Sequence, residues 1–174
     1  MKKHALRWLA LAALLLAGCR ADLATKAWAV KSFKDEPLTL VPGLLEFRYA
    51  ENRAIAFSML RDVPGHIRMP LIFGLGGLSM LALSVYAWTR RRQGALRMVP
   101  LAMILAGAFG NLQDRLTHGY VVDFIRVHWH ETWSFPIFNL ADSLISVGVA
   151  LLILQGLLEK GGKETRRADP APAA

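Results

Sequence analysis

Long uncharged stretches, separated by short charged clusters, dominate the pattern of hydrophobic and polar positions along this chain. Residues 69–89 contain no charged side chain, residues 98–113 form a second uncharged run, and residues 138–158 carry a single charge at Asp142. A helix of about 20 apolar residues, at about 1.5 Å per residue, crosses a hydrocarbon core of about 30 Å. The pattern therefore predicts a membrane-spanning helix in each stretch.

A further apolar run, residues 8–19, is too short to span a membrane by itself. We expect its helix to begin near residue 4 and to continue past Arg20 to residue 28. The predicted fold is an all-α membrane protein built as a bundle of four transmembrane helices, with spans of about 4–28, 68–89, 97–114 and 138–158.

The segments between the spans contain patterns typical of strands. Residues 38–60 hold β-favouring side chains and a Pro-Gly pair, and residues 120–128 alternate between apolar and polar positions. We expect a small extracytoplasmic β-structure within two outer loops, 29–67 and 115–137. Residues 161–174 are polar and rich in Pro and Ala, which predicts a disordered cytoplasmic tail.

Basic side chains gather beside the spans rather than on one face. The clusters are Lys2, Lys3 and Arg7; Arg90, Arg91, Arg92 and Arg97; and Lys160, Lys163, Arg166 and Arg167. Clustered Lys and Arg mark the cytoplasmic side of a membrane, so both termini are predicted to lie inside. The formal charge of +8 is thereby explained by topology. Nucleic-acid binding, which needs a basic face with readout residues, is not indicated.

Composition excludes several classes of protein. With 54% hydrophobic and 20% charged residues, a chain of 174 residues is too apolar for an ordinary soluble enzyme. A single cysteine, Cys19, excludes an intrachain disulfide and a cysteine-cluster zinc site. His130-Glu131 lacks the second histidine of a His-Glu-x-x-His zinc site. We expect neither a metal nor an organic cofactor.

Residues 1–19 also resemble the export signal of a bacterial lipoprotein, with a basic start, an apolar run and small residues before Cys19. In that alternative Cys19 is lipidated and the first helix is removed. We prefer a buried structural cysteine, because Asp22, Thr25 and Lys26 follow at helical spacing and extend the same helix.

Ionisable groups within spans cost at least about 2.5 kcal/mol at mid-helix and are therefore candidates for function. A polar triplet with i, i+3, i+4 spacing stands near one end of each of three predicted helices. The triplets are Asp22, Thr25 and Lys26; Asn111, Asp114 and Arg115; and Asn139, Asp142 and Ser143. A structural Asp–Lys pair is the alternative for the first triplet.

Two carboxylates stand at the same predicted depth among apolar neighbours, Asp123 beyond the third helix and Asp142 inside the fourth. Like charges at close range resist joint ionisation, so one retains a proton while the other acts as a base. Aspartic peptidases activate water in this way. Spacing alone does not prove that the two side chains meet.

Four elements of the chain, taken in order, resemble the lipoprotein signal peptidases, also called signal peptidase II. They are DLATK from Asp22 to Lys26, NRAIAFS from Asn52 to Ser58, GAFGNLQDRLTHGYVVDFI at 107–125, and FPIFNLAD at 135–142. The chain departs from the family pattern at Ala54 and Ile55, where glycine and alanine are usual, and at Ala106, where glycine is usual. These departures put loop details in doubt rather than the reaction.

The resemblance implies an intramembrane aspartic endopeptidase that removes signal peptides from diacylglyceryl-modified prolipoproteins, cleaving just before the lipidated cysteine. It implies catalytic roles for Asp123 and Asp142, without metal or cofactor. Substrate-binding or supporting roles fall on Asn111, Arg115, Asn139, Asn52, Asp22 and Lys26.

The expected setting is the bacterial inner membrane, with the site toward the outer face. The expected partners are prolipoproteins, membrane lipid and globomycin-type inhibitors, with the chain acting as a monomer. A small transporter that uses its membrane Asp and Lys residues remains the alternative from another class. The absence of an evident inverted repeat makes it the weaker hypothesis.

Overall fold

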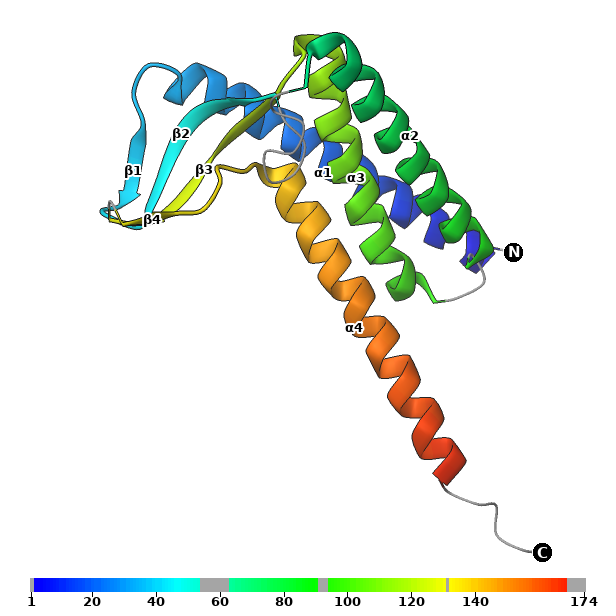
Figure 1. Cartoon of the computed structure of the whole chain (residues 1–174). Coiled ribbons are helices and arrows are strands. Elements are labelled where there is room, and N and C mark those ends of the chain that lie inside the picture. The colour runs from blue at the N-terminus through cyan, green and yellow to red at the C-terminus, as the bar shows by residue number, and fades with distance from the viewer. Residues whose placement is uncertain (1, 54–62, 91–93, 131, 169–174) are drawn as a thin grey trace, which may run out of the picture.

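The computed structural model describes residues 2–53, 63–90, 94–130 and 132–168. Within these residues, long helices form a bundle and a small antiparallel sheet lies at one end of it (Figure 1). The elements are α1 Lys2–Phe33, β1 Leu38–Val41, β2 Leu45–Asn52, α2 Gly65–Thr89, α3 Ala95–His118, β3 Val121–Trp129, β4 Trp133–Ser134 and α4 Leu140–Ala168.

Each helix contains an apolar stretch long enough to cross a membrane. The stretches are Trp8–Phe33, Gly65–Thr89, Leu96–His118 and Leu140–Glu159. The predicted four-helix membrane bundle with a small sheet is therefore confirmed. Helix α1 runs without a break through Cys19, whose side chain is buried with its thiol 3.6 Å from the Ala106 carbonyl oxygen.

Helix α4 is longer than the sequence pattern predicts. The pattern predicts a disordered segment from residue 161, whereas the helix continues to Ala168. Residues 163–168 are rich in Lys, Glu and Arg, which have high helix propensity, and this outweighs the cost of Gly161 and Gly162. The rest of the expected tail, 169–174, lies outside the described residues.

Helix α3 is the centre of the bundle and packs against α1, α2 and α4. A Cβ atom at Gly107 of α3 would meet the carbonyl oxygen of Ala141 and would lie 2.8 Å from Ile145 Cγ1. Glycine therefore permits the backbones of α3 and α4 to approach closely. This contact places the first turn of α4 beside the polar end of α3.

The sheet has the strand order β1-β2-β3-β4 and is antiparallel throughout. Strand β2 pairs with β3 so that Ala50 faces Asp123 and Asn52 faces Val121. Phe33 at the end of α1 lies 5.4 Å from Phe47 of β2, and Phe47 lies 5.8 Å from Phe124, measured between ring centroids. This aromatic cluster fixes the sheet on α1 and holds Asp123 near the helix ends.

Candidate active site

A single asparagine connects the two candidate aspartates. Asn139 precedes α4, and its Nδ2 donates to Asp123 Oδ1 at 2.7 Å. Its Oδ1 accepts the backbone N–H of Asp142 at 2.9 Å, and its own backbone N–H donates to Asp142 Oδ2 at 3.3 Å. The last two bonds form a reciprocal capping box at the start of α4. The structure thus brings together carboxylates that are distant in sequence.

Each carboxylate also accepts a hydrogen bond from a further asparagine. Asn52, at the end of β2, donates to Asp123 Oδ2 at 2.9 Å. Asn111 of α3 donates through Nδ2 to Asp142 Oδ1 at 2.8 Å. Asp123 is 2% exposed, whereas Asp142 is partly buried. Both groups are therefore held in fixed orientations by amide donors.

The environment of Asp123 favours its protonated form. Burial, together with the nearby charge of Asp142, raises the pKa of this carboxyl from its ordinary value of 3.8 to about 7. The hydrogen bonds from Asn52 and Asn139 oppose this shift without cancelling it. Asp123 can consequently hold or release a proton near neutral pH.

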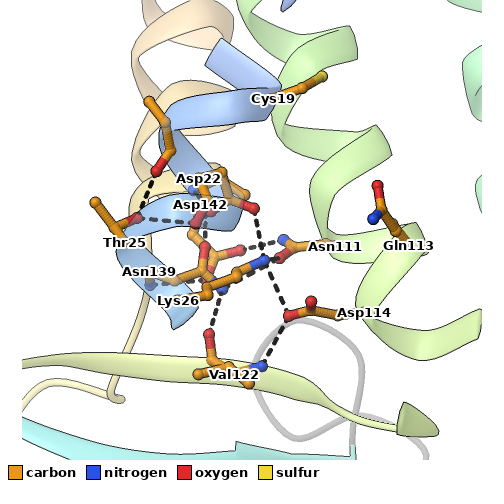
Figure 2. A network of polar contacts seen from close by, with 12 residues as sticks. Cys19, Asp22, Thr25, Lys26, Asn111, Gln113, Asp114, Val122, Asn139 and Asp142 are labelled. Carbon is orange, nitrogen blue, oxygen red and sulfur yellow. Dashed lines mark hydrogen bonds and ion pairs between the residues drawn. The ribbon is translucent and has the colours of Figure 1, made fainter. Parts of the chain in front are cut away.

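A buried ion-pair cluster lies beside Asn111 (Figure 2). Lys26 Nζ lies 2.7 Å from Asp22 Oδ2 and 3.1 Å from Asp114 Oδ2, and it donates to Asn111 Oδ1 at 3.0 Å. Asp22 Oδ1 accepts the backbone N–H of Ala141 in the first turn of α4, at 2.9 Å. The cluster therefore joins α1, α3 and α4.

The sequence makes Asp114 a candidate through its polar triplet but assigns it no role, and the structure gives it a defined place. Its Oδ2 accepts the backbone N–H of Val122 at 3.0 Å, one residue before Asp123. The polar triplet of α3 drew attention to this position, but spacing could not show that β3 returns to meet it.

A cavity of about 860 Å³ extends from these polar groups between α2, α3 and α4. Asp142 lines it directly, and Asp123 is connected to it through Asn52, another lining residue. Arg115 also lines the cavity, with its Nη1 donating to the Asn111 carbonyl oxygen at 3.2 Å. The remaining wall is largely apolar and includes Ile72, Leu75, Gly76, Met80, Phe138, Ile145 and Val147.

The sequence did not predict that α2 contributes to this wall. Apolar residues occur on every face of α2, so the pattern does not indicate which face points to the cavity. The unusual positions Ala54 and Ile55 lie outside the described residues, as does most of the element around them. The described residues contain no group of three or more His, Cys, Asp or Glu side chains that could hold a metal ion.

An apolar cavity that ends at Asp142, with Asp123 linked to that carboxylate through Asn139, suits a membrane-embedded aspartic peptidase. Comparison with known proteins agrees. The family model for signal peptidase II matches residues 12–158. The lipoprotein signal peptidase of Shewanella piezotolerans is 39% identical over 97% of this chain and 95% of its own length. That of Pseudomonas paraeruginosa is 41% identical over 74% of this chain and 76% of its own.

Solved structures show the same architecture. A bacterial membrane enzyme determined by the in meso method at 2.3 Å resolution matches with a TM-score of 0.70 and 25% identity, covering 95% of this chain and 94% of its own. A second, determined at 1.9 Å, has a TM-score of 0.70 and 28% identity over 86% of this chain and 92% of its own. With its fold, its linked aspartates and these relatives, the chain belongs to the signal peptidase II family of aspartic-type membrane peptidases.

Proposed function

We propose that this protein removes the signal peptide of diacylglyceryl-modified prolipoproteins by cleaving the bond before the lipidated cysteine, with Asp123 and Asp142 as the catalytic pair. The observation that carries the proposal is the Asn139 bridge between the two carboxylates at the end of an apolar cavity. An apolar cavity suits a substrate whose signal helix and acyl chains remain in the bilayer.

The two carboxylates divide the proton transfers. Asp142 takes a proton from water as the water oxygen attacks the carbonyl carbon, and Asp123 gives its proton to the carbonyl oxygen. When the C–N bond breaks, the proton on Asp142 passes to the leaving amine and a hydroxyl proton of the intermediate returns to Asp123. The raised pKa of Asp123 supports its role as the proton holder.

The neighbouring polar residues position these groups and the substrate. Asn52, Asn111 and Asn139 orient the carboxylates through the hydrogen bonds described above. Arg115 lines the cavity, where its guanidinium can bind substrate backbone carbonyls or the oxygens beside the lipid. Asp22 and Lys26 support the start of α4 and the amide of Asn111.

The proposed setting is the bacterial inner membrane, with both termini cytoplasmic and the sheet and catalytic pair at the outer face. There the enzyme works as a monomer in contact with lipid. Globomycin-type cyclic peptides are expected to compete with substrate for the cavity.

The test is cleavage of a diacylated prolipoprotein by Asp123→Asn and Asp142→Asn variants. Both substitutions keep shape but remove ionisation, so each should lower turnover by at least about 1,000-fold while insertion stays normal. The double variant should be no worse than either single variant, because groups that act as a unit are not additive. Near-normal turnover in either inserted variant would refute the aspartic mechanism.

A further inference from the structure

We infer that Lys26 is a positioning residue for the catalytic pair, because its ammonium group fixes the Asn111 amide with the N–H side toward Asp142. This inference rests on the proposed catalytic pair. It assigns to a residue of α1 an effect on the reaction that passes mainly through a side chain of α3.

An asparagine amide has two similar ends, an oxygen that accepts and a nitrogen that donates. The oxygen of Asn111 is held by two donors, Lys26 Nζ at 3.0 Å and Asn139 Nδ2 at 3.1 Å. The nitrogen is thereby directed to Asp142 Oδ1 at 2.8 Å. A flipped amide would place its oxygen against the Asp142 carboxylate, where two acceptors repel each other. Lys26 and Asn139 therefore both favour the productive orientation, and Lys26 does so with a charged donor, which makes the stronger hydrogen bond.

Lys26 uses its three N–H donors within the buried cluster, so it has none left to bind the substrate or the attacking water. An ammonium group has three N–H donors. Asp22, Asp114 and Asn111 account for three contacts, at 2.7, 3.1 and 3.0 Å. The side chain is 3% exposed, and Lys26 is not among the residues that line the cavity. It reaches Asp142 only through Asn111.

Charge compensation within the cluster limits the direct electrostatic effect of Lys26 on the catalytic pair. Burial is the largest influence on the pKa of Asp123, and the charge of Lys26 is the smallest of the named contributions that oppose it. One ammonium group faces two carboxylates, those of Asp22 and Asp114, so the fully ionised cluster carries one net negative charge. Lys26 is therefore already matched by closer partners. Its influence on Asp142 is better explained by the orientation of Asn111 than by its charge.

This charge balance permits a variant that removes Lys26 without changing the net charge. Lys26→Met alone would leave two buried carboxylates uncompensated and could prevent folding. In Lys26→Met/Asp114→Asn one cation and one anion disappear together, and the asparagine oxygen can still accept the Val122 N–H. The matched control is Asp114→Asn alone, which retains Lys26, Asp22 and Asn111.

The measurements are kcat, KM and the pH profile of cleavage of a diacylated lipopeptide by detergent-purified protein. Small misplacements of catalytic groups cost up to about 100-fold. We expect kcat of Lys26→Met/Asp114→Asn to fall at least about 10-fold below that of Asp114→Asn, with KM within about twofold, because Lys26 does not line the cavity. Its pH profile should differ from that of Asp114→Asn, because an Asn111 amide that has turned no longer donates to Asp142. Asp114→Asn alone should keep the wild-type pH profile despite a partial loss of rate.

A third variant, Lys26→Gln/Asp114→Asn, keeps a neutral N–H donor for Asn111 at the same net charge. We expect its kcat to stay within about threefold of that of Asp114→Asn. This variant tests the inference by itself if the methionine variant does not insert. A correctly inserted glutamine variant that falls 10-fold would overturn the inference. So would a methionine variant whose kcat and pH profile match the control.

Failure of this inference can be distinguished from failure of the proposed function. If the Asp123→Asn and Asp142→Asn variants are inactive while removal of Lys26 changes nothing, only the positioning role is lost. If those aspartate variants cleave normally, the catalytic assignment itself fails.

Discussion

Asp123 is buried on a strand, accepts two amide hydrogen bonds, and lies near another carboxylate. Water is thus replaced by fixed dipoles, which support a carboxylate less well than full hydration does. The shifted pKa of about 7 therefore has a thermodynamic consequence as well as a catalytic one.

The first prediction is that the protein loses thermal stability as the pH rises from about 4 to above 7. The folded-state pKa of Asp123, about 7, exceeds the ordinary value of 3.8, so the folded protein binds the proton more tightly than the unfolded chain. This stabilisation is complete below the ordinary value and is lost as the pH rises through about 7. Melting of the detergent-purified protein at pH 5 and pH 8 measures it.

The Asp123→Asn variant should show a smaller drop in melting temperature between these two pH values. Asp35→Asn changes an exposed carboxyl in the segment after α1 and should retain the wild-type drop. An Asp123→Asn protein as pH-sensitive as the wild type would show that other groups control the dependence.

Sequence spacing predicted part of this site at the residue scale. The i, i+4 spacing of Asp22 and Lys26 indicated an ion pair as the alternative to a functional role, and the structure shows that pair at 2.7 Å. Spacing could not show that Asn139 contacts both aspartates, because one of its bonds joins its side chain to Asp123 on β3, 16 positions away. Nor could it show that Asp114 accepts the Val122 N–H, which depends on where β3 returns to α3.

At the scale of elements, the position of Asp142 depends on how closely α4 approaches α3 and α1. The first turn of α4 is fixed at two points: Asp22 accepts the Ala141 N–H, and the backbone of Ala141 lies against Gly107 of α3. Both contacts fall immediately before Asp142. Separation of α3 from α4 would therefore displace one catalytic carboxylate from the other.

The second prediction concerns Gly107→Ala. The added Cβ would overlap the Ala141 carbonyl oxygen and crowd Ile145, so the helices must move apart. Overpacking of this kind costs about 1–3 kcal/mol, and we expect a lower melting temperature together with reduced cleavage. The matched control is Gly77→Ala in α2, where no atom lies within 4 Å of the added Cβ.

Gly77→Ala should keep or slightly raise the melting temperature, since alanine favours a helix by about 1 kcal/mol over glycine. If the two variants melt alike, the close approach of α3 and α4 does not control stability.

Hydropathy predicted that the helices exist, but it did not predict which face of each helix contacts lipid and which contacts another helix. About half of the apolar stretch of α3 is buried within the protein, whereas only 6% of that of α2 is buried, although both sequences are similarly apolar. A face that touches lipid and one that touches another helix can have the same composition, because lipid tails and leucine side chains are equally apolar. Thus the contribution of α2 to the cavity required the structure.

At the scale of the whole molecule, the sheet and the polar site lie at the same end of the bundle. Strand β3 follows α3 directly and Asn139 precedes α4, so both aspartates stand where helices meet the sheet. The start of α1, the end of α2 and the start of α3 lie at the opposite end, as does the end of α4 (Figure 1). The described residues of the three basic clusters belong to these helix ends: Lys2, Lys3 and Arg7 of α1, Arg90 directly after α2, Arg97 of α3, and the basic residues after Glu159 in α4.

The last prediction is that this segregation sets the orientation in the membrane. Lys and Arg beside spans are retained on the cytoplasmic side, so the end that bears the basic clusters should lie inside and the catalytic pair should face outward. Single cysteines at Asp35, Gln93 and Ala173, each in a Cys19→Ser background, test this in intact cells with a membrane-impermeant maleimide. Only Asp35→Cys should be labelled, because it follows α1 beside the sheet.

After the membrane is permeabilised, Gln93→Cys and Ala173→Cys should react as well, which shows that their thiols are available. The Cys19→Ser parent should remain unlabelled and should still cleave substrate, since Cys19 is buried against Ala106 and lies apart from both aspartates. Labelling of Gln93→Cys in intact cells would place the basic clusters outside. The catalytic pair would then face the cytoplasm, away from exported prolipoproteins, and the proposed function would have to be abandoned.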